Sequence, residues 1–108
     1  MIHKIFIETD RGLVVRVTFT LPNSIWADVI YLVGDFNNWD RTSHRLQRGR
    51  DGDWNVTIDL ELGRSYQFRY LRDGDHWMND SQADAYVANP YGGDNSVVVT
   101  DPPSENTL

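Results

Sequence analysis

The chain has no cysteine among its 108 residues, so a disulfide framework and thiolate chemistry are excluded. Long apolar runs are also lacking: none approaches the ~20 residues of a membrane-spanning helix. The first residues have neither the apolar segment nor the small-residue cleavage site of a signal peptide. We therefore expect a cytoplasmic location, although the lack of cysteine does not itself define the compartment.

Basic residues are few. Ten Lys and Arg stand against 16 Asp and Glu, which gives a net charge of −6. Nucleic acids and anionic membrane surfaces are bound through a basic stripe or cluster, and the sequence contains none. We expect neither nucleic acid nor a membrane as a partner.

Patterns that carry catalysis or hold a metal are missing as well. A calcium loop that starts at Asp73 would need glycine at its sixth position, where Met78 stands. A glycosidase acid pair drawn from Asp73, Asp75, Asp80 and Asp84 would need a deep cleft, which so small a β-protein does not offer. The three histidines are scattered, and the serines fit no nucleophile motif. We expect no cofactor, no metal and no enzymatic activity.

What the chain does have is a succession of short strand patterns separated by turn signals. Alternating or continuous apolar residues predict strands at 13–21, 29–33, 54–62, 65–72, 76–78 and 97–100. Residues 79–94 lose the pattern and are predicted to form a long surface loop. Sustained helical periodicity is absent, so the sequence predicts an all-β fold, an antiparallel immunoglobulin-like β-sandwich of about seven strands. One domain is expected over residues 1–100, followed by a flexible tail at 101–108.

The parity of these strands also predicts which side chains are buried. Trp26, which follows the turn after the first of them, is expected to cover the bottom of the sandwich. The residues expected in the core are Val15, Val17, Phe19, Trp54, Val56, Ile58 and Phe68.

Two further tryptophans end short turn motifs. Trp39 closes Val-Gly-Asp-Phe-Asn-Asn-Trp (33–39), and Trp77 closes Arg-Asp-Gly-Asp-His-Trp (72–77). Turn residues at these places let an indole project from a loop end, and an exposed indole plane can stack on the apolar face of a pyranose ring. Arg69, Asn95 and the Asn37–Asn38 pair would supply hydrogen-bond donors for sugar hydroxyls. This combination favours a protein that holds sugar chains.

Each of these residues also has a purely structural interpretation, which the sequence leaves open. Trp39 could pack over the sandwich edge, and Trp77 could cap the core from its hairpin. Arg69 could solvate the outer sheet face or pair with an acid such as Asp59. Asn95 could bond only to loop backbone.

Four pieces in this order resemble a known family: 31–39, Trp54 in its alternating strand, 66–74 before Trp77, and 79–98. Together they resemble the α-glucan-binding modules at the front of isoamylase, pullulanase and glycogen-branching enzymes and in the β subunit of AMP-activated protein kinase. The resemblance runs from about Leu13 to Thr100, and its last piece is closer to the isoamylase-type branch. It implies an early-set immunoglobulin-like sandwich.

The resemblance also implies a site. Trp39 and Trp77 would cradle the glucan, Arg69 would bond to hydroxyls, Tyr91 would wedge into the curl of the chain, and Asn95 would bond to a glucose. Three features depart from the family pattern: Arg69 stands where Lys is frequent, Tyr91 occupies the apolar wedge position, and Asp75-His76 adds a residue before the second indole.

The function implied is non-catalytic binding of α-1,4-glucan, with a polysaccharide or malto-oligosaccharide as partner. An alternative stays open: an interaction domain that packs on a glucan-active enzyme or a regulatory partner and keeps a vestigial sugar site. Tryptophan and tyrosine are enriched in both kinds of surface.

Overall fold

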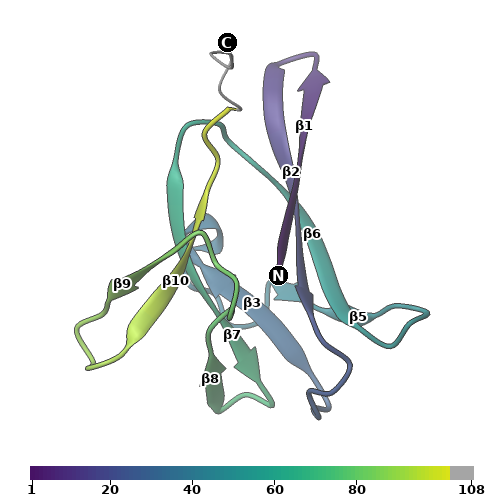
Figure 1. Cartoon of the computed structure of the whole chain (residues 1–108), viewed down its shortest axis with the longest axis vertical. Helices are drawn as coiled ribbons and strands as arrows, with labels where there is room; N and C mark the ends of the chain where they lie inside the picture. Colours follow the sequence, from purple (N-terminus) through teal and green to yellow (C-terminus); the bar gives the residue numbers. More distant parts are fainter. Residues whose placement is uncertain (103–108) are drawn as a thin grey trace.

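Two antiparallel β-sheets face each other across one hydrophobic core in the computed structural model, which describes residues 1–102 (Figure 1). The four-stranded sheet has the order β1 (Ile2–Thr9), β2 (Gly12–Leu21), β6 (Trp54–Leu60) and β5 (Gln47–Arg48). The six-stranded sheet has the order β4 (His44–Arg45), β3 (Ile30–Gly34), β7 (Ser65–Arg72), β10 (Asp94–Val99) and β9 (Ala85–Ala88), and β8 (His76–Met78) also pairs with β7. The predicted β-sandwich is confirmed.

The core lies where strand parity predicts it. Phe19 and Phe68 from the two sheets meet edge to face with ring centroids 5.0 Å apart. Five of the seven predicted core residues are buried, and Val56 and Ile58 are half-buried and pack against them. Trp54 is only 4% exposed, as expected.

The strands differ from the prediction at two places. Strand β1 was not predicted, yet it pairs with β2 along its whole length, from Ile2 opposite Phe19 to Thr9 opposite Gly12. Strand β9 lies inside the predicted 79–94 loop, so that part of the prediction is wrong. All four β9 residues are exposed, which leaves no alternating pattern to find, and the strand is held by its ladder to β10. With the two-residue strands β4 and β5, the described residues contain ten strands rather than about seven.

Trp26 does not cover the bottom of the sandwich, because its side chain is 87% exposed. Its neighbours Ile25 and Ala27 pack against the core instead. In this irregular segment the two neighbours turn inward, whereas Trp26 faces solvent. Trp54 takes the buried position, and its indole N–H donates to the carbonyl of Ile25 at 3.2 Å.

A buried carboxylate ties the sheets to the segment that follows β8. Asp80 is fully buried, and its Oδ2 accepts hydrogen bonds from the Tyr70 hydroxyl and from the Met1 amino group, each at 2.8 Å. The backbone N–H of Gln82 donates to Oδ1 of the same carboxylate, and the N–H of Asp80 donates to Ser96 Oγ. Burial raises the pKa of the Tyr70 hydroxyl well above its usual value, and the charge of Asp80 adds to the effect.

Part of the predicted tail at 101–108 lies outside the described residues, since the description ends at residue 102. Within residues 1–102 no helix is long and apolar enough to cross a membrane. The same residues contain no group of three or more His, Cys, Asp or Glu side chains that could hold a metal ion.

Candidate functional site

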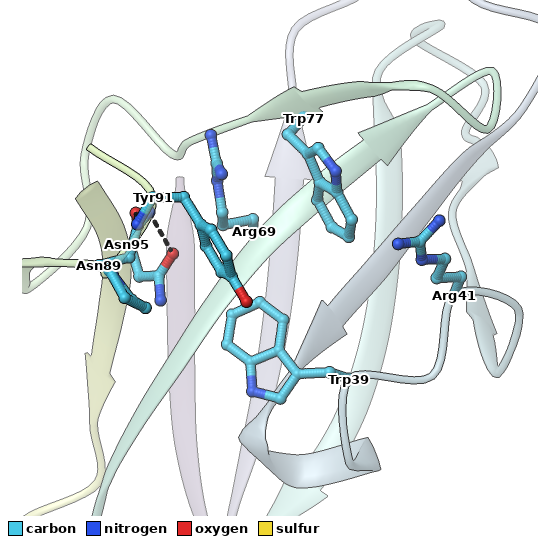
Figure 2. A pocket seen from close by; sticks show the side chains of 8 residues that line it. Trp39, Arg41, Arg69, Trp77, Asn89, Tyr91 and Asn95 are labelled. Carbon is cyan, nitrogen blue, oxygen red and sulfur yellow. Dashed lines mark hydrogen bonds between the residues drawn. The ribbon is translucent and has the colours of Figure 1, made fainter. Parts of the chain in front are cut away.

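Five of the seven side chains named from the sequence lie together around one open hollow of about 400 Å³, and Asn37 and Asn38 are not in its lining (Figure 2). We call it the first hollow, and its lining is Trp39, Arg41, Arg69, Trp77, Asn89, Pro90, Tyr91 and Asn95. Arg69 alternates along β7 with Phe68 and Tyr70, which are buried in the core. The hollow therefore lies on the face of the six-stranded sheet that is turned away from the core.

Trp39 is positioned by the turn that follows β3. The 3₁₀ helix η1 (Asp35–Asn37) ends at Asn38, and both Asn38 and Trp39 have left-handed backbone, with φ of 56° and 59°. The N–H of Trp39 donates to the carbonyl of Gly34 at 2.9 Å. This turn carries the indole out from the end of the strand, as Figure 2 shows, and the half-buried side chain lines the hollow.

The Trp39 indole is also fixed through its own nitrogen. Nε1–H donates to Asp35 Oδ1 at 2.9 Å, and the other oxygen of that carboxylate accepts the backbone N–H of Gln67 at 2.7 Å. One carboxylate thus joins the indole to strand β7. The ring orientation is set before any ligand arrives.

The contacts of Gly34 and Asn37 explain why these residue types occupy their positions in the 33–39 motif. A Cβ on Gly34 would come within 2.5 Å of the Gln67 carbonyl oxygen and 2.8 Å of Phe68 Cβ, so only glycine fits at this crossing. Asn37 accepts from the N–H of Gly34, and its amide nitrogen donates to the carbonyl of Leu32. Asn37 was expected among the sugar donors, but this side chain is used inside the turn.

Trp77 comes from β8, which the Asp73-Gly74 turn brings back along β7. Both turn residues have positive φ, 54° and 80°, as a tight hairpin requires. Two guanidinium groups lie over its ring: Arg41 Cζ is 5.5 Å and Arg69 Cζ 5.8 Å from the ring centroid. Figure 2 shows the indole between the two arginines, which hold it by cation–π attraction.

Arg69 does not pair with Asp59, so that structural alternative is wrong. Asp59 lies in the other sheet and makes a bidentate ion pair with Arg16, at 2.8 and 3.0 Å. The Arg16 hydrogen bond lowers the pKa of the Asp59 carboxyl. The Nε atom of Arg69 is buried without a hydrogen-bond partner among the described residues. Because Nε is shielded from solvent, a ligand in the hollow would be met by the terminal nitrogens of the guanidinium.

Asn95 bonds to side chains rather than to loop backbone. Its amide nitrogen donates to Gln67 Oε1 at 3.0 Å, and its oxygen accepts from the Asn89 amide at 3.3 Å, the dashed line in Figure 2. An asparagine amide has two N–H donors and two lone pairs. Asn95 therefore keeps one donor and one acceptor for a hydroxyl group.

Tyr91 stands at the tip of the β9–β10 hairpin and is 93% exposed. The loop is closed by Asn89, whose Oδ1 accepts the N–H groups of Tyr91 and Gly93. Figure 2 shows the phenol reaching from this loop toward Trp39. The ring forms an aromatic wall that faces solvent and is carried by an ordered turn.

Three lining residues were missed. Asn89 and Pro90 belong to the Asn-Pro-Tyr-Gly-Gly piece of the resemblance, but only Tyr91 was given a role from it. Arg41 follows Trp39 by two residues, and no local pattern indicates that it reaches Trp77. The lining includes no carboxylate, histidine, serine or cysteine. It offers flat apolar faces and hydrogen-bond donors, which suit binding rather than acid–base chemistry.

The fold and the hollow define a small β-sandwich with an open aromatic binding surface. Residues 16–105 match the family described as the glycogen recognition site of AMP-activated protein kinase. The chain belongs to this family of carbohydrate-binding modules. Strand β1 lies outside the matched segment.

Curated relatives contain the same segment in far longer chains. Over 77% of its own length, the chain is 31% identical to the 1,4-alpha-glucan branching enzyme GlgB of Aquifex aeolicus, and it covers 14% of that enzyme. It is 36% identical to the GlgB enzyme of Photobacterium profundum over 72% of its length, covering 10% of the relative. With an alpha-amylase of Niallia circulans the identity is 30% over 78% of the chain and 7% of the relative. The chain thus spans a seventh or less of these relatives.

Proposed function

We propose that this chain is a non-catalytic module that binds α-1,4-glucan, of the glycogen or starch type, in the first hollow. Trp39 and Trp77 act as stacking platforms, Arg69 and Asn95 bond to hydroxyls, and Tyr91 packs against the curl of the chain. The observation that carries the proposal is the grouping of two half-buried indoles, a guanidinium and an amide in one open hollow. Neutral sugar rings need flat faces and such donors together.

The chemistry of the hollow also supports a module without catalysis of its own. Its lining offers no carboxylate pair for glycoside cleavage. A glucan-active enzyme linked to or associated with such a module would be held at its substrate. The cytoplasmic location and the single domain over residues 1–100 stay predictions from the sequence.

The affinity should be modest. An open surface with two platforms and a few solvated hydrogen bonds gains little over the cost of ordering a flexible oligosaccharide. We expect dissociation constants of about micromolar to millimolar, which correspond to binding free energies of roughly 4–8 kcal/mol. Cello-oligosaccharides should bind more weakly, because their flat ribbon does not follow a curved cradle.

The test is a calorimetric titration with maltoheptaose of the parent, Trp39→Ala and Trp77→Ala. Each variant should lose about 2 kcal/mol or more of binding free energy, as aromatic hot spots do. Leu13→Ala, an exposed apolar residue of the other sheet, is the control and should bind as the parent does. The melting temperatures of the parent and the two variants should be nearly equal.

Two results would reject this assignment. If the parent binds no maltoheptaose, or if both variants bind it as the parent does, the interaction-domain alternative is favoured. If either tryptophan variant unfolds, that indole supports the fold and is not a platform.

A further inference from the structure

Trp26 is an exposed indole in the segment between β2 and β3, outside the first hollow. Isolated apolar side chains on a surface are ordinary and need no explanation. The case for a function depends on how this indole is held and on what lies beside it.

The segment around Trp26 is anchored on both sides. Ile25 and Ala27 pack against the core, and the carbonyl of Ile25 accepts the buried Trp54 indole N–H. Farther along, one oxygen of Asp73 accepts the N–H groups of Asp28 and Val29, at 2.8 and 3.1 Å. Trp26 is therefore presented by fixed backbone, which reduces the ordering cost of binding to it.

A second hollow, of about 530 Å³, lies at the two residues that directly follow Trp26 in the chain. Its lining is Ala27, Asp28, Arg45, Leu46, Gln47, Arg48 and Trp54, and none of these residues lines the first hollow. Trp26 is not part of this lining, but it directly precedes two of the lining residues, so its exposed side chain leaves the backbone next to the hollow. The Arg48 guanidinium lies 4.3 Å from the Trp54 ring centroid and donates to the carbonyl of Gly52, so the floor of the hollow is ordered.

The second hollow shares guanidinium and amide groups with the first and adds a carboxylate. The lining provides the guanidinium of Arg45, the amide of Gln47 and the carboxylate of Asp28, and the exposed indole of Trp26 comes from the same backbone segment as Asp28. Sugar hydroxyls both donate and accept, and this group of side chains offers partners for both.

A protein partner fits this surface less well. Stable protein interfaces bury ~800 Å² per partner around an apolar centre. Of the large apolar side chains that are exposed among residues 1–102, only Trp26 lies in the segment beside this hollow. One isolated indole in polar surroundings provides a platform for a single sugar ring.

We propose that Trp26 and the second hollow form an additional carbohydrate-binding surface that takes an α-glucan chain. The identity of this ligand rests on the proposed function of the first hollow, whereas the existence of the surface does not. Because the two surfaces share no residues, one molecule can hold a polysaccharide at two places. Its retention on a polymer then exceeds what either surface gives alone.

The experiment follows the indole N–H resonances, four in the parent and two in Trp39→Ala/Trp77→Ala, by ¹⁵N NMR during a maltoheptaose titration. In the double variant the Trp26 resonance should still shift and saturate. In the parent background, Trp26→Ala should weaken retention on amylose about tenfold, and Leu13→Ala should not change it. This single variant also serves if the double variant fails to fold.

The outcomes separate the two proposals. Shifts at Trp39 and Trp77 with a silent Trp26 and unchanged amylose retention of Trp26→Ala overturn the second surface and leave the proposed function intact. Shifts at Trp26 alone support the second surface and overturn the first. If no indole responds to maltoheptaose, both proposals are overturned. The second surface is also overturned if Trp26 responds to a protein but not to maltoheptaose.

Discussion

At the residue scale, the arginines that meet over Trp77 show how a mobile side chain becomes a fixed platform. Arg69 comes from β7 and Arg41 from the turn after Trp39, and both lie within 6 Å of the ring centroid. Each such contact contributes about 0.5–1 kcal/mol at an exposed site. The same guanidinium groups remain able to donate to a bound sugar, because an arginine has five N–H donors.

Removing single donors should weaken binding in smaller steps than removing an indole. Arg69→Ala and Asn95→Ala should each cost about 1 kcal/mol of glucan binding free energy, the usual size for a hydrogen bond to a solvated group. Maltoheptaose calorimetry measures the loss. Arg16→Ala is the matched control, because Arg16 is bound to Asp59 in the other sheet. A similar loss in the control would mean that net charge, rather than contact, governs binding.

Residue identity could be predicted from the sequence where a local motif carries it. Trp39 and Trp77 follow residues typical of turns, which carry an indole out from the end of a strand. Arg69 alternates with buried aromatic residues. Arg41 could not be found this way, since its approach to Trp77 depends on how the turn after η1 sits beside β8. Asn37 was assigned wrongly because a turn asparagine and a ligand-binding asparagine look alike in sequence. Trp26 was expected to be covered in addition to Trp54, and its irregular segment has no alternating pattern that gives the direction of a side chain.

At the element scale, the first hollow depends on the close approach of the β3–η1 junction to strand β7, because Trp39 follows this junction. Gly34→Ala should destabilise the protein by about 1–3 kcal/mol, because the added methyl group would overlap β7 backbone and force a shift. Urea denaturation measures the change. Gly93→Ala is the control: its nearest neighbour would be 3.5 Å away, so stability should change by less than ~0.5 kcal/mol. Equal stability of the parent and Gly34→Ala would contradict the close approach.

The strands that were predicted well are those with a one-sided apolar pattern. Strands β7 and β8 were predicted with the bounds that they have, and β2 differs by one residue. Strand β9 has no buried side chain, and β1 carries Ile5 and Ile7 on one face with Ile2 and Phe6 on the other. Such strands are held by backbone hydrogen bonds to the neighbouring strand, and the residue types in the sequence do not predict these bonds.

At the scale of the whole molecule, the buried Tyr70–Asp80 pair links stability to pH. The folded-state pKa of Tyr70 is raised, so the fold favours the neutral phenol. The corresponding stability is fully present below the unfolded-state value of about 10 and is lost as the pH rises from there toward the folded-state value.

Tyr70→Phe should therefore show a shallower loss of melting temperature than the parent as the pH is raised from 9 to 11. The variant should be less stable at neutral pH, because Asp80 loses a buried hydrogen bond. Comparison of the two slopes removes the contributions of the other titrating groups, which both proteins share. Parallel curves would contradict the role given to Tyr70.

The Asp35 carboxylate has a further consequence for how occupancy of the first hollow can be observed. It joins the indole N–H of Trp39 to the backbone N–H of Gln67 in the middle of the six-stranded sheet. A sugar that shifts electron density or position at the indole perturbs that carboxylate, and the carboxylate transmits the change to a backbone amide. We therefore expect the proton-exchange rate and the ¹⁵N shift of the Gln67 amide to change when a sugar binds against the Trp39 ring.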